Sequence, residues 1–184
     1  MSITLITGPM FSGKTTELTR QIDIETIIGN NCVIIKHVND TRYCDDNKII
    51  THFGKVYDKC DIILRDNLND EFCNELIEKY QVVGIDEGFM FNNISHYCNL
   101  LADNGLKVII ASINSSYIQK KFEEISNLMA TCEYLIKLYS VCNFCKKKAH
   151  FTVREIEDDR EIIVGGNDIY KAVCRKCKNK LFKN

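Results

Sequence analysis

Short runs of apolar, mostly β-branched residues recur along the chain, and polar turns separate them. Runs of this kind are typical of strands that are buried on both faces of a sheet. They predict strands at Ile3–Thr7, Cys32–Lys36, Val82–Ile85, Lys107–Ala111 and Tyr134–Leu138.

The longer stretches between these runs predict helices at Lys14–Ile28, Leu68–Lys79 and Asn93–Asp103. In the last stretch the apolar side chains follow helical spacing, at Ile94, Tyr97, Cys98 and Leu101. Strands that alternate with helices predict an α/β fold with a mostly parallel sheet. The polar segment Asp40–His52 shows no periodicity, and we expect a mobile loop there.

The composition limits the class of protein. The chain has 184 residues, of which 45% are hydrophobic and 27% are charged. These values allow one sizeable core and exclude disordered, collagen-like and coiled-coil proteins. The N-terminus lacks a signal-peptide pattern, and no run approaches the roughly 18 apolar residues of a membrane span. We therefore expect a cytoplasmic protein that does not contact a membrane.

Charge is divided unevenly along the chain. The formal net charge of −1 excludes a broad basic field that would attract nucleic acid. Residues 1–141 carry 13 basic and 19 acidic side chains, whereas residues 142–184 carry 11 and 6. This division predicts an α/β domain over residues 1–139 and a small, separate lobe over residues 140–184.

A G-x-x-x-x-G-K-[ST] motif follows the first predicted strand and opens the first predicted helix. This is a P-loop, in which backbone N–H groups and the helix N-terminus bind phosphates, the Lys adds positive charge and the Thr hydroxyl ligates Mg²⁺. The strand and helix around it favour nucleotide binding over a structural glycine turn. The predicted phosphate-binding residues are Gly8, Pro9, Met10, Phe11, Ser12, Gly13, Lys14 and Thr15.

Two carboxylates, Asp86 and Glu87, follow the predicted strand Val82–Ile85. In a P-loop protein, an Asp at such a strand end can hold Mg²⁺ directly or through water, so we assign Asp86 and Thr15 to the Mg²⁺ site. Glu87 is then available as the base for an attacking hydroxyl or water. A surface pair that caps a turn would be the simpler interpretation without the P-loop.

Four of the ten cysteines form two Cys-x-x-Cys pairs, Cys142 with Cys145 and Cys174 with Cys177. Four thiolates make the closed shell of a structural zinc site, which can fold a lobe that lacks a large core. A redox Cys-x-x-Cys and two disulfides are the alternatives, and a reducing compartment disfavours the disulfides. Among the other cysteines, Cys32 and Cys98 are expected in the core.

The basic run Lys146–Lys148 and the basic tail Arg175–Lys183 permit a second hypothesis, a nucleotide-gated zinc protein that binds nucleic acid. The acidic first domain and the lack of an aromatic stacking platform in the tail disfavour it. We expect solvated surface there and no stable nucleic-acid binding. A catalytically inactive regulatory protein is disfavoured because the P-loop Lys and Thr and both carboxylates are present.

Taken in order, these motifs resemble the type II thymidine kinases, a family of cellular enzymes and their poxviral relatives, and the chain looks most like the poxviral members. The resemblance covers nearly the whole chain. It is carried by the P-loop, Asp40–Tyr43, Thr51–His52, Gly84–Gly88, Val164–Tyr170 and the two cysteine pairs.

The resemblance implies ATP- and Mg²⁺-dependent transfer of the γ-phosphate to the 5′-hydroxyl of thymidine, giving dTMP for nucleotide salvage and DNA synthesis. It implies that Glu87 is the catalytic base, that Asp86 supports the metal and that Arg42 contacts phosphate. It also implies a structural zinc ion, a homotetramer or homodimer and, for a viral protein, the host cytoplasm.

In this family the zinc-held lobe carries a lasso that closes over the base of the nucleoside. The resemblance implies a nucleoside site formed by Met10, Ile113, Tyr117, Phe122, Thr152, Ile162, Ile163, Val164, Gly165 and Tyr170.

Three segments depart from the family pattern. The family commonly has Asp-Glu-Gly-Gln-Phe-Phe where this chain has Phe89 and Met90 at the fourth and fifth positions. It often has Leu-Asp-Gly-Thr-Phe-Gln-Arg-Lys-Pro-Phe where Ile113–Phe122 keeps the aromatic spacing but lacks Gly and Pro. Phe53 replaces the usual Asp after Thr51-His52. These changes leave the reaction class standing and bear on which nucleosides are accepted.

Overall fold

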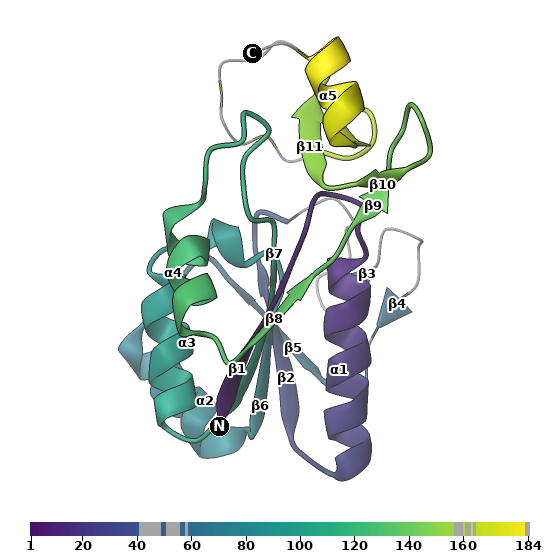
Figure 1. The fold of residues 1–184 in the computed structure, drawn as a ribbon. Coiled ribbons are helices and arrows are strands. Elements are labelled where there is room, and N and C mark those ends of the chain that lie inside the picture. Colours follow the sequence, from purple (N-terminus) through teal and green to yellow (C-terminus); the bar gives the residue numbers. More distant parts are fainter. Residues whose placement is uncertain are drawn as a thin grey trace.

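A six-stranded parallel sheet forms the centre of the computed structural model, which describes residues 1–40, 49–50, 56–57, 59–156, 160, 163 and 165–182. The strand order is β5-β2-β6-β7-β1-β8 (Figure 1). The strands are β1 (Ser2–Thr7), β2 (Cys32–His37), β5 (Asp61–Arg65), β6 (Val82–Ile85), β7 (Lys107–Ser112) and β8 (Tyr134–Lys137). All predicted strands lie in this sheet, and the predicted α/β class is confirmed.

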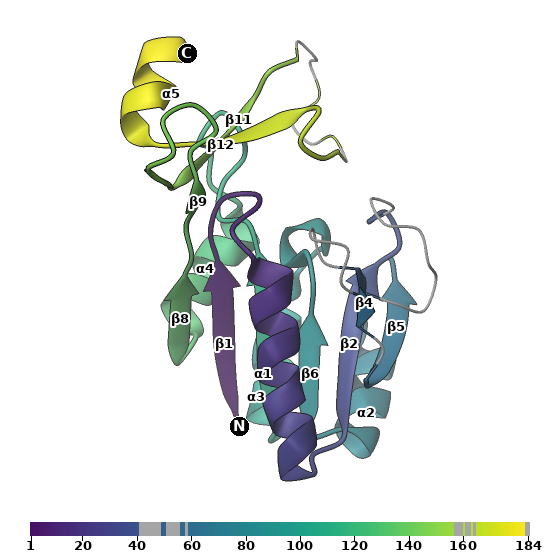
Figure 2. The ribbon, with the colours of Figure 1, turned by 90° about the vertical axis from the view of Figure 1, so that its right-hand side faces the viewer.

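Helices cover both faces of the sheet. Helix α1 (Lys14–Ile28) lies on one face, and α2 (Asp70–Lys79), α3 (Ile94–Asp103) and α4 (Glu123–Thr131) lie on the other (Figures 1 and 2). A short 3₁₀ helix, η1 (Gly88–Met90), follows β6. The three predicted helices are confirmed to within two residues at each end.

The strands bury side chains on both faces, which explains their unbroken apolar runs. In β2, Cys32 and Ile34 pack in the α1-side core with Leu18 and Ile22. The alternate residues Val33 and Ile35 pack in the core on the α3 side, which also holds the fully buried Cys98. Cys32 and Cys98 are therefore core residues, as predicted.

The chain between β2 and β5 differs in part from its prediction. Most of the segment Asp40–His52 lies outside the described residues. Within it, however, Ile49–Ile50 forms β3 and pairs with β4 (Val56–Tyr57) in an antiparallel ribbon. The expectation of a loop without secondary structure is wrong at these two residues, because backbone pairing with a later segment leaves no periodic signal in so short a strand.

The C-terminal segment forms a small lobe above the carboxyl ends of the sheet strands (Figures 1 and 2). Its elements are β9 (Ser140–Val141), β10 (Lys148–Ala149), β11 (Phe151–Arg154), β12 (Tyr170–Val173) and α5 (Arg175–Leu181). The lobe has its own small buried cluster, formed by Cys142, Ala149, Val153, Ala172 and Val173. Among the described residues, no helix has the length and apolarity that crossing a membrane requires.

Candidate active site

The P-loop connects β1 to α1 at the carboxyl edge of the sheet, and two glycines allow its path. Gly13 precedes α1 with φ 82, a left-handed conformation. A Cβ on Gly8 would lie 2.7 Å from the carbonyl oxygen of Leu138, so no larger residue fits where the loop passes the end of β8. The loop ends at the N-terminus of α1, where free N–H groups and the helix dipole favour an anion.

Two side chains of the loop fold back on its backbone. Ser12 Oγ and Lys14 Nζ both donate hydrogen bonds to the carbonyl oxygen of Pro9, at 2.8 and 2.9 Å. The Lys14 side chain is buried. A positive charge is therefore held beside the backbone N–H groups of the loop, and both features attract a phosphate.

Thr15 and Asp86 meet although 71 positions separate them in the chain. The hydroxyl oxygen of Thr15 lies 3.1 Å from each carboxylate oxygen of Asp86. Asp86 is only 4% exposed. A hydroxyl and a carboxylate are oxygen ligands of the kind that Mg²⁺ prefers. The chemistry of this pair fits the predicted metal.

Glu87 lies next to this pair in an unusual backbone conformation. Its φ is 50, and its backbone N–H donates a hydrogen bond to Asp86 Oδ1 at 3.1 Å. The residue is buried, and the following Gly88 lies against Ile110, whose Cδ1 would be 2.5 Å from an added Cβ. A non-glycine residue with positive φ costs free energy and persists where the surroundings fix it, as they do in many active sites.

The P-loop also contacts the C-terminal lobe directly. The backbone N–H of Met10 donates to Thr152 Oγ1 at 2.9 Å, and Ser140 Oγ donates to the Phe11 carbonyl oxygen at 2.9 Å. The Phe11 side chain packs against the apolar cluster of the lobe. The lobe is thus fixed to the same loop that would hold the phosphates.

The loop 113–122 carries three of the predicted nucleoside-binding residues. Ile113 lies directly after β7, and an isolated bridge between Ser115 and Lys121 closes the loop. Tyr117 lies near the tip and contacts Arg154 of the lobe. Phe122 instead packs on Phe89, with ring centroids 5.1 Å apart, at the margin of the α3-side core.

Strands β11 and β12 carry further predicted nucleoside-binding residues. The Tyr170 hydroxyl donates to the Ile163 carbonyl oxygen at 3.0 Å and accepts from the Ile163 N–H at 3.2 Å. Gly165 is half-buried, and Ile169 leaves no room for a side chain there. Ile163 is therefore fixed by Tyr170, while Thr152 holds the P-loop.

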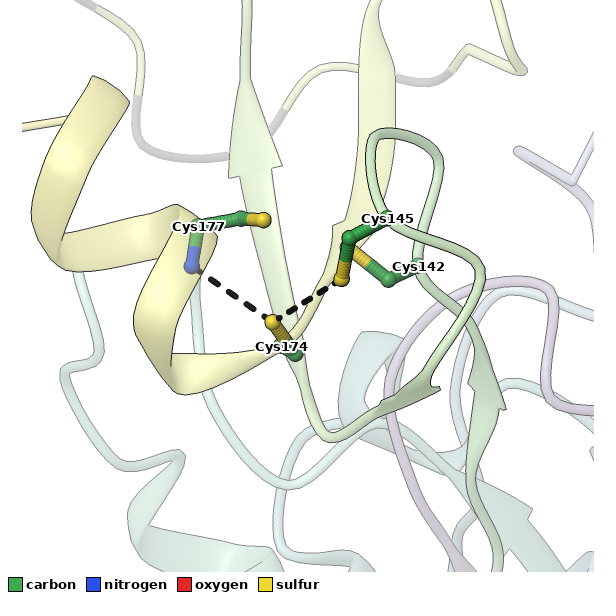
Figure 3. A group of neighbouring side chains, drawn as sticks. All are labelled: Cys142, Cys145, Cys174 and Cys177. Carbon is green, nitrogen blue, oxygen red and sulfur yellow. Dashed lines mark hydrogen bonds between the residues drawn. The ribbon is translucent and has the colours of Figure 1, made fainter.

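The four paired cysteines come together in the lobe as the sequence predicts. Figure 3 shows their side chains converging, two from the turn between β9 and β10 and two from the junction of β12 with α5. All four sulfur atoms lie within 4.8 Å of one another, and Cys145 and Cys174 are 3.5 Å apart. This donor set fits one tetrahedral ion with thiolate ligands, which is the usual arrangement of structural zinc.

The local environment shifts the pKa values of two of these thiols in opposite directions. Burial opposes ionisation of Cys142, but hydrogen bonds from the backbone of Cys145 and its neighbours prevail and lower its pKa to about 6. At Cys177, burial and the neighbouring thiols raise the pKa to about 12. Thiolates this close repel one another, so a divalent cation would stabilise the charged form of the cluster.

Comparison with known proteins identifies the family. A family model described as thymidine kinase matches residues 1–178. The chain belongs to the thymidine kinase family. It is 49% identical to a thymidine kinase of Acanthamoeba polyphaga mimivirus, over 97% of this chain and 82% of the relative. It is 42% identical to a thymidine kinase of Choristoneura fumiferana entomopoxvirus, over 97% of each of the two chains. It is 39% identical to a thymidine kinase of Vaccinia virus (strain Western Reserve), over 95% of each of the two chains.

Membership in the thymidine kinase family confirms the resemblance and the prediction of a kinase enzyme. Of the predicted site residues, Arg42, Ile162 and Val164 lie outside the described residues. Met10 and Tyr117 contact the lobe directly, whereas Phe122 packs at the margin of the α3-side core. Met10 and Thr152 are in direct contact, as are Thr15 and Asp86.

Three residues at the junction were not predicted. Ser140 and Gln119 link elements through hydrogen bonds, and Arg154 contacts Tyr117. Arg154 could have been found, because it follows Thr152 by two positions in a strand and shares its face. Ser140 stands in no motif, and Gln119 lies within the segment Ile113–Phe122 but at a position to which that pattern gives no role. Only the fold shows which groups these two residues bond.

Proposed function

We propose that this protein is a thymidine kinase that transfers the γ-phosphate of ATP to the 5′-hydroxyl of thymidine. The observation that carries the proposal is the contact of Thr15 with Asp86 at the mouth of the P-loop, with buried Glu87 adjacent. Family membership supports the reaction class. The product dTMP would serve nucleotide salvage and DNA synthesis.

In this proposal each group has one task. Residues 8–15 bind and orient the phosphates of ATP, and Thr15 and Asp86 hold Mg²⁺. Bound ATP would supply the γ-phosphoryl group, and its bond to the β-phosphate oxygen would break with ADP as the leaving group. Mg²⁺ and Lys14 would offset the charge of the transferred group. The Glu87 carboxylate accepts the proton of the 5′-hydroxyl as that oxygen attacks. Arg42 is proposed as a further phosphate contact.

The nucleoside is proposed to lie between the P-loop and the lobe. Met10, Ile113, Tyr117 and Phe122 would form its apolar side, and Thr152, Tyr170 and the chain 162–165 would cover the base. The backbone at Gly165 is proposed to recognise the edge of a pyrimidine, while the backbone of Ile163 is held by the Tyr170 hydroxyl. A covered site excludes water, which would otherwise compete with the 5′-hydroxyl.

Zinc is proposed as the ion of the four-cysteine cluster, in a structural role, because four thiolates leave no open coordination position. The lobe of residues 140–184 would then be a metal-stabilised unit beside the domain of residues 1–139. The separate apolar cluster of the lobe supports this division.

A homotetramer or homodimer in the cytoplasm, the host cytoplasm if the protein is viral, completes the proposal. Edge strand β8 exposes Tyr134 and Leu135, and α1 exposes Ile27 to 85% and Ile28 to 67%. Exposed apolar side chains on two elements support contact with further copies. Sedimentation equilibrium would test the assembly, and a monomer at all concentrations would contradict it.

One experiment separates the proposed kinase from a nucleotide-gated nucleic-acid-binding protein. ATP consumption is measured with Mg²⁺ and either thymidine alone or single-stranded DNA alone. The proposal predicts consumption with thymidine and none above background with DNA. Stimulation by DNA alone would favour the alternative.

A further inference from the structure

Arg154 is a buried cation at the end of β11 and belongs to none of the predicted sites. It is 8% exposed. Removing a guanidinium group from water costs free energy unless hydrogen bonds and charge or ring contacts compensate. Its partners are therefore informative about why a charge is buried at this place.

The strand register places Arg154 among the proposed nucleoside-binding residues. Because side chains alternate along a strand, Thr152 and Arg154 lie on the same face of β11. Arg154 is also paired with Tyr170 of β12, and paired residues of an antiparallel ribbon point to the same face. Arg154 thus stands beside Thr152 and opposite Tyr170.

The third neighbour comes from the other domain. The guanidinium carbon of Arg154 lies 3.8 Å from the ring centroid of Tyr117, and Nη2 donates a hydrogen bond to the Tyr117 hydroxyl at 2.7 Å. Nη1 donates to the carbonyl oxygen of Arg160. The planar guanidinium group of Arg154 therefore bonds Tyr117 through Nη2 and Arg160 through Nη1.

A second bond fixes the backbone of the same loop. The Gln119 side-chain amide donates to the carbonyl oxygens of Tyr117 and Thr152, at 3.0 and 3.2 Å. Gln119 has φ 68, so the turn is held in a conformation that a non-glycine residue rarely adopts. Two contacts therefore join the loop to β11. The Gln119 side chain bonds the Thr152 carbonyl oxygen, and the Tyr117 hydroxyl accepts from Arg154.

We propose that Arg154 is a positioning residue for the nucleoside: it fixes Tyr117 against Thr152 and Tyr170, so that these three side chains present one surface to the base. The inference rests on the proposed thymidine kinase function and deepens it. Lys cannot take this role, because its single ammonium group lacks the planar fork that serves the Tyr117 hydroxyl and the Arg160 carbonyl together.

Two variants test the proposal, Arg154→Lys, which keeps the charge, and Tyr117→Phe, which keeps the ring. Thymidine KM and kcat are measured at saturating ATP, and thymidine binding is measured by calorimetry without ATP. We expect Arg154→Lys to raise thymidine KM and Kd roughly 10-fold or more, the size of one lost charged hydrogen bond. The ATP KM should stay within about twofold of the wild type.

Tyr117→Phe is expected to weaken thymidine binding in the same direction, and the double variant should bind no more weakly than Arg154→Lys alone. Such non-additivity shows that the two residues act through one contact. If Arg154→Lys fails to fold, Tyr117→Phe with its half-buried ring still tests the contact through the same binding measurement.

Arg175→Lys is the matched control, since Arg175 lies over the Phe151 ring at 4.6 Å in the same lobe. It should leave thymidine KM unchanged. Unchanged thymidine binding in both test variants would overturn the inference, as would equal rises of the thymidine and ATP KM values. A wild-type protein that neither binds nor phosphorylates thymidine would instead contradict the proposed function itself.

Discussion

Three residues at the end of β6 and the start of α1 carry the proposed metal-binding and proton-accepting groups. Thr15 and Asp86 are in contact, and Glu87 is joined to Asp86 through its backbone N–H. Because the backbone of Glu87 is left-handed, its side chain leaves the chain in a different direction from that of Asp86. Two adjacent carboxylates can thereby serve two functions, one at the metal and one at the substrate hydroxyl.

Replacing Glu87 with Gln tests its role as the base. The amide keeps the size of the side chain but cannot accept the proton, so kcat should fall by about 10²- to 10⁴-fold while ATP affinity is retained. Steady-state rates and nucleotide binding by calorimetry measure the two effects. Glu78→Gln, at an exposed position of α2, is the control. A kcat equal to that of the wild type would remove Glu87 from the mechanism.

Replacing Asp86 with Asn tests the metal site. The change keeps an acceptor for Thr15 but removes the negative charge, so the Mg²⁺ concentration for half-maximal activity should rise by about 10- to 100-fold. A titration of activity with Mg²⁺ at fixed ATP measures this. An unchanged Mg²⁺ requirement would show that Asp86 does not support the metal.

At the residue scale, the structure brings together the residues whose type and spacing the predicted chemistry requires. The P-loop, the carboxylate pair and the four cysteines are of this kind. Gln119 was not predicted because its role comes from a contact with Thr152 that no local pattern encodes. For Arg154, strand alternation could have placed the side chain on the face of Thr152, but not its bond to Tyr117. Arg154 donates to the Tyr117 hydroxyl, and this hydroxyl is itself a difference from the family pattern, which has Phe at this position.

At the scale of elements, the lobe has only a small apolar cluster of its own. Its buried cluster consists of a few small or medium-sized residues, and the paired cysteines join two turns that are far apart in the sequence. A bound ion would fix both turns at once.

Loss of one ligand should therefore release the metal and loosen the lobe. Cys174→Ser is expected to lower zinc content from one ion per chain to near zero and to abolish thymidine phosphorylation, with ATP binding retained by the first domain. Elemental analysis and limited proteolysis measure these effects, and Cys60→Ser is the matched control. A fully active preparation without metal would disprove a structural zinc ion.

A second element-scale prediction concerns the packing of α1 on β7. Lys107 Nζ lies 2.6 Å from Glu25 Oε1, and Asn30 also donates to Glu25. Burial raises the pKa of Glu25, but the hydrogen bonds and the charge of Lys107 outweigh it, so the pKa lies below its ordinary value of 4.5. A lowered carboxyl pKa stabilises the fold above pH 4.5, and this stabilisation is lost as pH falls through the folded value.

Lys107→Met should accordingly lower the free energy of unfolding by about 1 kcal/mol at neutral pH, a modest value because the Lys107 side chain is partly exposed. The difference from the wild type should shrink as the pH falls from 4.5 through the lowered pKa of Glu25 in the fold, because the ion pair is lost when Glu25 is protonated. Urea unfolding at both pH values measures it. A difference that persists unchanged in acid would mean that packing, and not the ion pair, accounts for the loss.

At this scale the apolar runs predicted the central strands. The length of the stretches between the runs predicted the three helices, with helical spacing as added support in Asn93–Asp103. Strand β5 and helix α4 were not predicted, since Asp61–Arg65 is partly exposed at the sheet edge and Glu123–Thr131 presents only a short apolar face. The lobe strands β9 and β10 have two residues each, too few for a periodic signal.

At the scale of the whole molecule, the basic lobe lies over the carboxyl edge of an acidic α/β domain (Figures 1 and 2). The proposed site lies where the two meet, because the P-loop contacts the lobe through Met10 and Phe11. The charge division noted in the sequence thus coincides with a structural division. In the proposed site, local N–H groups and Lys14 would hold an anionic substrate without a basic surface.

The most direct measurement follows the phosphoryl group itself. The protein is incubated with Mg²⁺, thymidine and ATP labelled at the γ-phosphate, and the products are identified by chromatography and phosphorus NMR. We expect label on the 5′-oxygen of thymidine, as dTMP, with one ADP formed for each dTMP. ATP hydrolysis without labelled dTMP, or label at the 3′-oxygen, would contradict it.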